Sequence, residues 1–416
     1  MTQESLTEKL AKHLTLRVDE ATRTRARLHL LDWLGCVAGA RESKVAALLA
    51  KSHICPVETS SWLGNVLEMD DIHRTAILHP GPVIWQPVID AAEDAGVSMD
   101  KALDSAVRGY EAMVAVGSTF DAHHYAHYHP TATAGAFGAA AAVVSIHSLK
   151  PNQLLDALGN AGSTTGGLWQ MRHEAVMTKQ FHTATAAQNG YFAAFMARSG
   201  ITGPRMILEG PQGLYAATCR SPKPMEYPKR WRIWDVSFKP WGACRHAHPA
   251  IDAALELQAL LGKLDGEILV ETYSDAITFC DNLNPKTVHQ AKFSLQHAIA
   301  VVAVSGAPTL ADFEPAMINK LAKQRAKVTL RECKDISARY PEHYGARVTC
   351  NKQVVEMIDT LGDPERPMSE AQVIDKARAL MAWGGLSKKQ ADKAVKLALE
   401  GDDPAAIYKM LGKWLG

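Results

Sequence analysis

The spacing of apolar residues predicts that roughly the first 250 residues form mainly helices. Segment 19–40 repeats leucine and valine at helical intervals and reaches a glycine near its end. Segment 101–118 has the same pattern, and segments 130–147 and 183–200 are rich in alanine, glycine and threonine. Small side chains let neighbouring helices approach closely. We therefore expect a packed helical core.

Farther along the chain the pattern changes. Segments 267–277, 326–330 and 346–350 are short, rich in β-branched residues and partly alternating, which predicts strands. Segment 291–306, which lies between them, is more helical. After the loop at 362–367 the chain returns to helices, and we expect these helices to pack on the first domain.

The two patterns together predict a mainly α protein with a smaller α+β domain. We place the large all-helical domain at residues 1–241 and 362–416, and the smaller α+β domain at residues 242–361. A chain of 416 residues is long enough for two domains of ordinary size.

Composition narrows the possible partners. Lysine plus arginine number 45 and aspartate plus glutamate 44, so no overall basic field predicts nucleic-acid binding. Seven cysteines without a CxxC favour reduced thiols in the cytoplasm over disulfides, a structural zinc site or an iron–sulfur cluster. The N-terminus lacks a signal-peptide pattern, and the longest apolar run, 134–146, is too short to span a membrane. We expect a cytoplasmic protein that does not bind membranes.

Four polar islands interrupt this pattern, and the first is EMDDIHRTAILHPG at residues 68–81. It contains Glu68, Asp71, Arg74 and His79 and ends in a turn-forming Pro-Gly. Like charges so close together push their pKa values apart, which suits acid–base chemistry. The alternative is a solvated loop whose acids cap a helix.

The second island, DAHHYAHYHP at residues 121–130, holds four histidines. His123 and His127 have the spacing of two zinc ligands on a helix, but HExxH is absent and we expect no metal. His129 precedes a proline at the predicted start of a helix, and a helix N-terminus attracts anions and lowers the pKa of a nearby imidazole. The other histidines are expected to pack or to line the rim of a cleft.

The third and fourth islands add cations. Lys179 and His182 are three residues apart on a predicted helix and are therefore neighbours on its surface; the alternative is a solvated lysine at a helix start. Lys239, Cys244 and Arg245 lie in a loop rich in glycine, proline and tryptophan, which is a candidate carboxylate clamp. Alternatively, Cys244 is a small buried apolar residue.

Taken together, the islands resemble the MmgE/PrpD family, which includes 2-methylcitrate dehydratase, cis-aconitate decarboxylase and iminodisuccinate epimerase. The resemblance covers nearly the whole chain, and the order and spacing of its motifs are specific. The motifs that carry it are EMDDIHR…HPG at 68–81, YHPTATAGAFGAAAA at 128–142, ALGNAGSTTGG at 157–167, TKQFHTATAAQNG at 178–190, FKPWGACRHAHPAIDA at 238–253, AKFSLQHAIA at 291–300 and GDPERPMS at 362–369.

The resemblance implies a two-domain homodimer that uses neither metal nor cofactor and acts on di- or tricarboxylates in a cleft between its domains. It also implies a set of site residues. The implied catalytic residues are His79, His129, Lys179, Lys239 and an acid of the 68–71 segment, either Asp71 or Glu68; the candidate substrate-binding residues are Glu68, Arg74, His182, Cys244 and Arg245.

The shared chemistry of the family is proton transfer at a carbon next to a carboxylate or imine. We expect the two lysines to stabilise developing negative charge, the two histidines to exchange protons and the arginines to anchor carboxylates. The primary prediction is a lyase that dehydrates a 2-methylcitrate-like substrate. The alternatives are an epimerase of an iminodisuccinate-like dicarboxylate, a cis-aconitate-type decarboxylase, and an inactive metabolite-binding protein. His73 and Arg74 replace the Thr and Trp of the methylcitrate branch, so Arg74 could recognise a different carboxylate.

Overall fold

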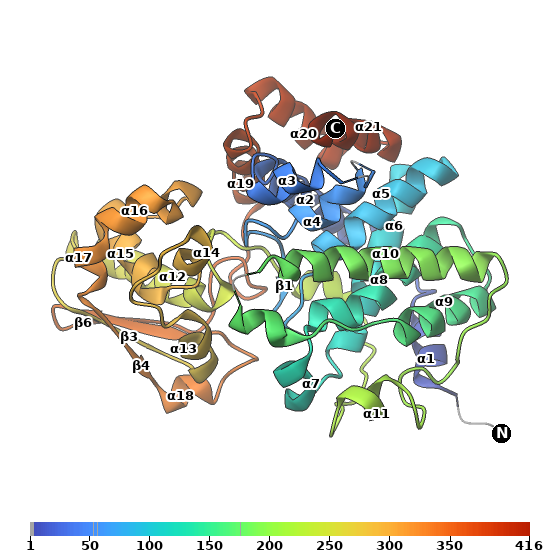
Figure 1. The fold of residues 1–416 in the computed structure, drawn as a ribbon, viewed down its shortest axis with the longest axis horizontal. Helices are drawn as coiled ribbons and strands as arrows, with labels where there is room; N and C mark the ends of the chain where they lie inside the picture. Colours follow the sequence, from blue (N-terminus) through green and yellow to red (C-terminus); the bar gives the residue numbers. More distant parts are fainter. Residues whose placement is uncertain (1–3, 53, 56, 175) are drawn as a thin grey trace. The chain divides into compact units, whose positions relative to one another are not determined.

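The described residues form two compact units in the computed structural model (Figure 1). Unit 1 comprises the described parts of Met1–Val236 together with Ser369–Gly416, and unit 2 comprises Ser237–Met368. Unit 1 is mainly helical and unit 2 combines helices with a sheet, so the predicted fold class is confirmed. The structure describes residues 4–52, 54–55, 57–174 and 176–416.

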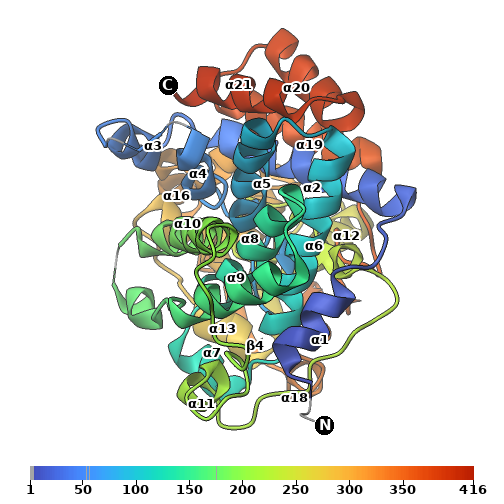
Figure 2. The same cartoon turned by 90° about the vertical axis from the view of Figure 1, so that its right-hand side faces the viewer.

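The core of unit 1 is built around one small-residue helix. Helix α8 (Pro130–Ile146) packs against both α6 (Met99–Gly117) and α10 (Thr178–Arg198) (Figures 1 and 2). A Cβ atom at Gly138 would lie 2.7 Å from the carbonyl oxygen of Gly109, so only glycine permits this approach of α6 and α8. The helices predicted at 101–118, 130–147 and 183–200 are confirmed.

The C-terminal helices belong to unit 1, as predicted. Helix α19 (Glu370–Trp383) packs along α2 (Glu20–Gly39), which is the helix predicted at 19–40 (Figure 2). Helix α21 (Pro404–Leu415) packs on α5 (Gly81–Ala95). Ser369–Gly416 therefore contributes directly to the packing of the helical unit.

Short helices and bridges complete unit 1. No helix among the residues that the structure describes is long and apolar enough to cross a membrane. The remaining elements are α1 (Leu6–His13), α3 (Lys44–Leu49), η1 (Val57–Thr59), α4 (Ser60–Leu63), β1 (Ile72–His73), α7 (Ala122–His127), α9 (Pro151–Ser163), η2 (Trp169–His173), α11 (Leu214–Thr218), η3 (Arg232–Asp235), α20 (Lys388–Glu400), and β2 (Val236–Ser237), where the chain passes into unit 2.

Unit 2 contains a four-stranded mixed sheet in the order β4-β3-β5-β6. Strand β3 (Ile268–Thr272) pairs parallel with β4 (Val328–Glu332) and antiparallel with β5 (Ala346–Cys350), which pairs antiparallel with β6 (Gln353–Met357). Helix α12 (His248–Leu261) packs on β5 and β6. The alternating burial of β3 and β5 shows that one face of the sheet supplies the core of the unit.

Two details of the strand prediction need correction. The strand predicted over 267–277 ends at Thr272, because the chain turns at Tyr273 and begins helix α13 (Ser274–Cys280). Strand β6 was not predicted, since it is a largely exposed edge strand with little apolar alternation. It follows a tight turn in which Asn351 and Lys352 both have positive φ, as a two-residue hairpin loop requires.

The other elements of unit 2 are α-helices and 3₁₀ helices. They are η4 (Arg245–Ala247), α14 (Val288–Lys292), α15 (Leu295–Ser305), η5 (Leu310–Phe313), α16 (Pro315–Lys320), α17 (Ala322–Arg325) and α18 (Lys334–Ser337).

Candidate active site

The acidic segment at residues 68–71 directs its three carboxylates to three different partners. Asp71 is buried, and its Oδ2 lies 2.7 Å from His29 Nδ1 and accepts a 2.7 Å hydrogen bond from the Tyr110 hydroxyl. Its Oδ1 accepts the backbone N–H of Gly81 at 2.8 Å. Burial raises the pKa of Asp71 to about 6. These bonds tie the segment to helices α2, α6 and α5, and the catalytic role predicted for Asp71 stays a prediction.

Glu68 faces Lys179. The Lys179 ammonium donates to both carboxylate oxygens of Glu68, at 2.5 and 2.7 Å. Glu68 has a φ of 58°, in the left-handed region that non-glycine residues adopt only at a cost. Lys179 lies in the first turn of α10, where the predicted helix surface places it. The side chains of Lys179 and Glu68 are only 15% and 5% exposed, so this charge pair is largely withdrawn from water.

His79 pairs with Asp70, a carboxylate that the sequence analysis did not single out. His79 Nδ1 lies 2.9 Å from Asp70 Oδ2, and the Asn65 amide donates to the same oxygen at 2.7 Å. The backbone N–H of His79 donates to the Thr131 hydroxyl in the first turn of α8. A histidine held by a carboxylate in this way has a fixed ring orientation and tautomer, which suits proton transfer.

His129 and His182 form a second histidine contact, with their Nδ1 atoms 3.2 Å apart. One nitrogen must donate and the other accept, so at least one ring is neutral. His129 precedes α8 as predicted, and its backbone N–H donates to the Gly167 carbonyl. Burial, followed by the charges of His182, Lys179 and His79, holds the pKa of His129 well below its usual value.

A buried ion pair supports the acidic segment from behind. The ammonium of Lys376, on α19, donates to Asp32 Oδ1 at 2.5 Å and to the Met69 carbonyl at 2.6 Å. Met69 lies between Glu68 and Asp70, so this bond fixes the backbone from which both carboxylates extend. Burial raises the pKa of Asp32 to about 6 even though the Lys376 charge lowers it. No local pattern in the sequence predicts this contact, because its partners are more than three hundred residues apart.

A cavity of about 460 Å³ opens beside His182. Its wall is mainly apolar and includes Leu168 and Phe181, which are 59% and 50% exposed on the molecular surface of the chain. Gly167, whose φ is 101°, also lines the cavity, and its carbonyl accepts the hydrogen bond from the backbone N–H of His129. The cavity has the size of a small-molecule site and reaches the histidine contact from one side.

Unit 2 carries the other predicted cations, Lys239 and Arg245. Lys239 is fully buried. Arg245 is 4% exposed, forms an ion pair with Asp363 through Nη2, and its guanidinium carbon lies 5.4 Å from the centre of the Tyr344 ring. Its Nε and Nη1 atoms are buried with no hydrogen-bond partner among the described residues. The Cys244 backbone N–H donates to the Lys292 carbonyl, and the cysteine side chain is 6% exposed.

Arg74 lies in the turn between the acidic segment and His79. The turn is closed by two backbone hydrogen bonds between His73 and Leu78. Arg74 is half-buried. Burial, followed by the charges of Arg232 and Arg74, lowers the pKa of His73 to about 3. His73 is therefore neutral at physiological pH, and Arg74 is the cation that this turn presents.

The other histidines of the histidine-rich segment lie apart from the contact between His129 and His182 in their hydrogen bonds and ring contacts. His123 and His127 lie on the short helix α7, with ring centroids 4.6 Å apart, and His127 Nδ1 contacts the His123 carbonyl. His124 is fully buried and stacks on Phe120 at 3.7 Å between ring centroids. Among the described residues, neither nitrogen of His124 has a hydrogen-bond partner, so this ring packs as an aromatic residue.

This burial predicts a pH-dependent effect of His124→Phe. Burial lowers the pKa of His124 to about 3, whereas an unfolded chain protonates its histidines below about 6.5. Stability is therefore lost as the pH falls below 6.5, by up to about 1.4 kcal/mol per pH unit for this one residue. We expect His124→Phe to remove that part of the slope in urea unfolding between pH 7 and pH 5. His173→Phe, at an exposed position, is the control; equal slopes in both variants would refute the prediction.

Comparison with known proteins identifies the chain. The MmgE/PrpD N-terminal domain matches residues 59–226, and the MmgE/PrpD C-terminal domain matches residues 241–401. The chain belongs to the MmgE/PrpD family. The N-terminal match lies within unit 1 of this MmgE/PrpD protein, whereas the C-terminal match covers most of unit 2 and continues into α19 and α20.

Curated relatives of this MmgE/PrpD protein are cis-aconitate decarboxylases and a related protein. The cis-aconitate decarboxylase of Homo sapiens is 28% identical over 205 residues, which are 46% of this chain and 42% of that protein. The cis-aconitate decarboxylase-like protein oryM of Aspergillus oryzae is 29% identical over 214 residues, 47% of this chain and 44% of that protein. The cis-aconitate decarboxylase of Aspergillus terreus is 24% identical over 219 residues, with 48% and 44% covered. The chain thus aligns with less than half the length of each relative.

Proposed function

We propose that this MmgE/PrpD protein is a lyase that acts on a small di- or tricarboxylate by moving a proton on a carbon next to a carboxylate. The observation that carries the proposal is the group of Glu68–Lys179, His79–Asp70 and His129–His182 contacts in unit 1. It combines a cation, three histidines and two carboxylates in a largely buried setting, which is what acid–base chemistry at carbon requires.

Among lyase reactions we favour decarboxylation of a cis-aconitate-like substrate, since the named relatives carry that activity in their names. In such a substrate the bond to the departing carboxylate breaks, and its electron pair forms a new terminal double bond. The electrons of the old double bond then move to the carbon next to another carboxylate, and that carbon takes a proton. The dehydratase and epimerase predictions are the alternatives to this reaction.

Each residue of unit 1 is assigned the task that its surroundings suit. His129, neutral because burial lowers its pKa, is in the form that can accept a proton, and His182 is the group that shares it. His79, oriented by Asp70, is the second proton-transfer group. Lys179 stabilises the charge that develops on the substrate carboxylate, and Glu68 holds its ammonium in place. The predicted homodimer stays a prediction.

Lys239 and Arg245 are the carboxylate-binding groups of unit 2 in this proposal. Arg245 has a fork of donors, of which Nε and Nη1 have no hydrogen-bond partner among the described residues. A buried guanidinium in that state gains about 1.5–3 kcal/mol from a charged hydrogen bond. A substrate carboxylate supplies the acceptor.

The proposed reaction is tested by NMR in D₂O with purified protein and, separately, cis-aconitate, methylcitrate and iminodisuccinate. Decarboxylation gives carbon dioxide and a product with one new C–D bond. Dehydration gives a new alkene signal without loss of carbon, and epimerisation gives α-deuteration of the unchanged skeleton. No reaction with any of the three would refute the proposed lyase activity on this substrate class.

Arg245→Lys tests the carboxylate-binding role. Lysine keeps the charge beside Asp363 but lacks the planar fork, so we expect the fold to persist and KM to rise about 10–100-fold. The change in kcat should be smaller. Arg230→Lys, at an exposed ion pair with Asp235, is the control. A KM equal to that of the parent protein would contradict the assignment of Arg245.

A further inference from the structure

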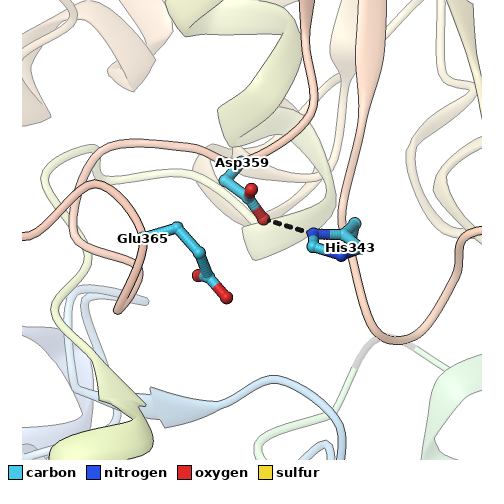
Figure 3. Close-up of side chains that lie close together, drawn as sticks. All are labelled: His343, Asp359 and Glu365. Carbon is cyan, nitrogen blue, oxygen red and sulfur yellow. Dashed lines mark hydrogen bonds and ion pairs between the residues drawn. The ribbon is translucent and has the colours of Figure 1, made fainter.

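A second cluster of ligating side chains lies in unit 2, outside the residues assigned so far. His343, Asp359 and Glu365 each offer one ligand atom, and these atoms lie within 4.8 Å of one another. His343 Nδ1 is 2.7 Å from Asp359 Oδ1, and Figure 3 shows the ends of all three side chains directed toward a common space. His343 and Asp359 are partly exposed and Glu365 is exposed, so an ion from solvent can reach them.

The segment that carries Asp359 and Glu365 is held firmly by buried groups. Asp252 Oδ2 accepts hydrogen bonds from the Thr360 hydroxyl and the Leu361 N–H, both at 2.7 Å. The backbone N–H of Gly362 donates to the Arg366 carbonyl, and that of Arg366 donates to the Asp363 carbonyl. Two of the three candidate ligands therefore project from a preorganised loop, which lowers the entropy cost of binding an ion.

We propose that His343, Asp359 and Glu365 form a binding site for a divalent cation of the Zn²⁺ type. One imidazole and two carboxylates are a ligand set that suits this ion, with water completing the coordination. Ligand atoms about 2.0–2.2 Å from zinc lie about 3.4 Å apart in a tetrahedron, so the exposed Glu365 side chain must rotate inward. The ion takes the place of the hydrogen bond between His343 Nδ1 and Asp359 Oδ1, and the neutral imidazole then carries its proton on Nε2.

The site adjoins both groups that support Arg245, and this contact suggests its role. Tyr344, which follows His343, carries the ring near the Arg245 guanidinium, and Asp363, in the same loop as Glu365, is its ion-pair partner. A cation bound by His343 on one segment and by Asp359 and Glu365 on the other would hold Tyr344 and Asp363 in place. The bound ion would therefore regulate substrate binding by fixing the position of Arg245. This role rests on the proposed function, in which Arg245 binds a substrate carboxylate.

Binding is tested with the full chain, dialysed against a chelator and then titrated calorimetrically with Zn²⁺ in the absence of substrate. We expect one ion per chain. The visible spectrum of added Co²⁺ provides an independent signal. His343→Ala and Glu365→Gln should each weaken binding at least about 10-fold, whereas His289→Ala and Asp335→Asn, at exposed positions of the same unit, should not.

Two outcomes would overturn the proposal. One is the absence of Zn²⁺ binding to the parent protein, which would leave His343 and Asp359 as an ordinary ion pair. The other is equal binding by the parent and by His343→Ala, which would place the ion elsewhere. Because these measurements need no substrate, they are independent of whether the proposed lyase activity is found. The regulatory role is tested separately by measuring KM in active, chelator-treated protein before and after Zn²⁺ is added back. We expect KM to fall when Zn²⁺ is restored, and an unchanged KM would refute the regulatory role alone.

Discussion

Replacing Lys179 by methionine is expected to reduce turnover by at least about 10³-fold while the chain remains folded. Methionine keeps most of the side-chain volume but removes the cation that faces Glu68, and preorganised charges of this kind are worth about 10²–10³-fold or more in rate. The loss should appear mainly in kcat, because the charge is needed most when negative charge develops on the substrate. Steady-state kinetics with the substrate identified by NMR provide the measurement.

The loss of Lys179 also leaves Glu68 as a buried carboxylate without this partner, so stability needs its own control. The double variant Lys179→Met with Glu68→Gln removes both charges, and we expect it to unfold at nearly the urea concentration of the parent while remaining inactive. Lys396→Met, at an exposed lysine of α20, should leave turnover unchanged. Near-normal turnover by folded Lys179→Met would eliminate Lys179 from the proposed mechanism.

Replacing Lys376 by methionine is expected to lower the free energy of unfolding by about 3–5 kcal/mol. The substitution leaves the fully buried Asp32 carboxylate without its cation and the Met69 carbonyl without a donor, and breaking one side of a buried ion pair has a cost of this size. Urea unfolding followed by circular dichroism measures the change. The midpoint should fall while the slope stays the same.

Two further variants show whether the burial of the pair is the cause. Arg378 lies on α19 like Lys376, and Arg378→Met breaks its ion pair with Asp392 of α20. Both of these side chains are almost half exposed, so we expect a loss of less than about 1 kcal/mol. The double variant Lys376→Met with Asp32→Leu should recover a large part of the stability, because no unpaired charge is left in the interior. If Lys376→Met is no less stable than Arg378→Met, the buried pair does not anchor α19 to the acidic segment.

Much of the fold follows from local patterns. The helices over 101–118 and 130–147 were predicted from their apolar spacing and from the small residues that let α8 contact its neighbours, and they form as expected. The strand at 346–350 was predicted from its β-branched alternation. The edge strand of the sheet was harder to predict. Strand β6 is exposed, and its pairing depends on a turn with two positive φ angles that its own residues barely indicate.

The candidate site, like the fold, could be predicted from the sequence only in part. The residue types needed for acid–base chemistry, and the neighbourhood of Lys179 and His182 on one helix, could be derived from the sequence, because an i, i+3 spacing fixes which side chains share a helix face. The orientation of the acids at 68–71 could not. No regular period governs an irregular segment, and Glu68 has a φ of 58°, a left-handed backbone conformation that its sequence does not indicate.

The sequence by itself therefore determined the helical architecture, the order of the polar islands and the family to which they belong. Only the tertiary structure decided that Glu68 meets Lys179, that Asp70 meets His79 and that Asp71 is directed into the interior toward His29 and Tyr110. The physical reason is the range of the interactions. Helix periodicity arises between residues three or four positions apart, whereas these partners come from distant parts of the chain and meet only when the helices pack.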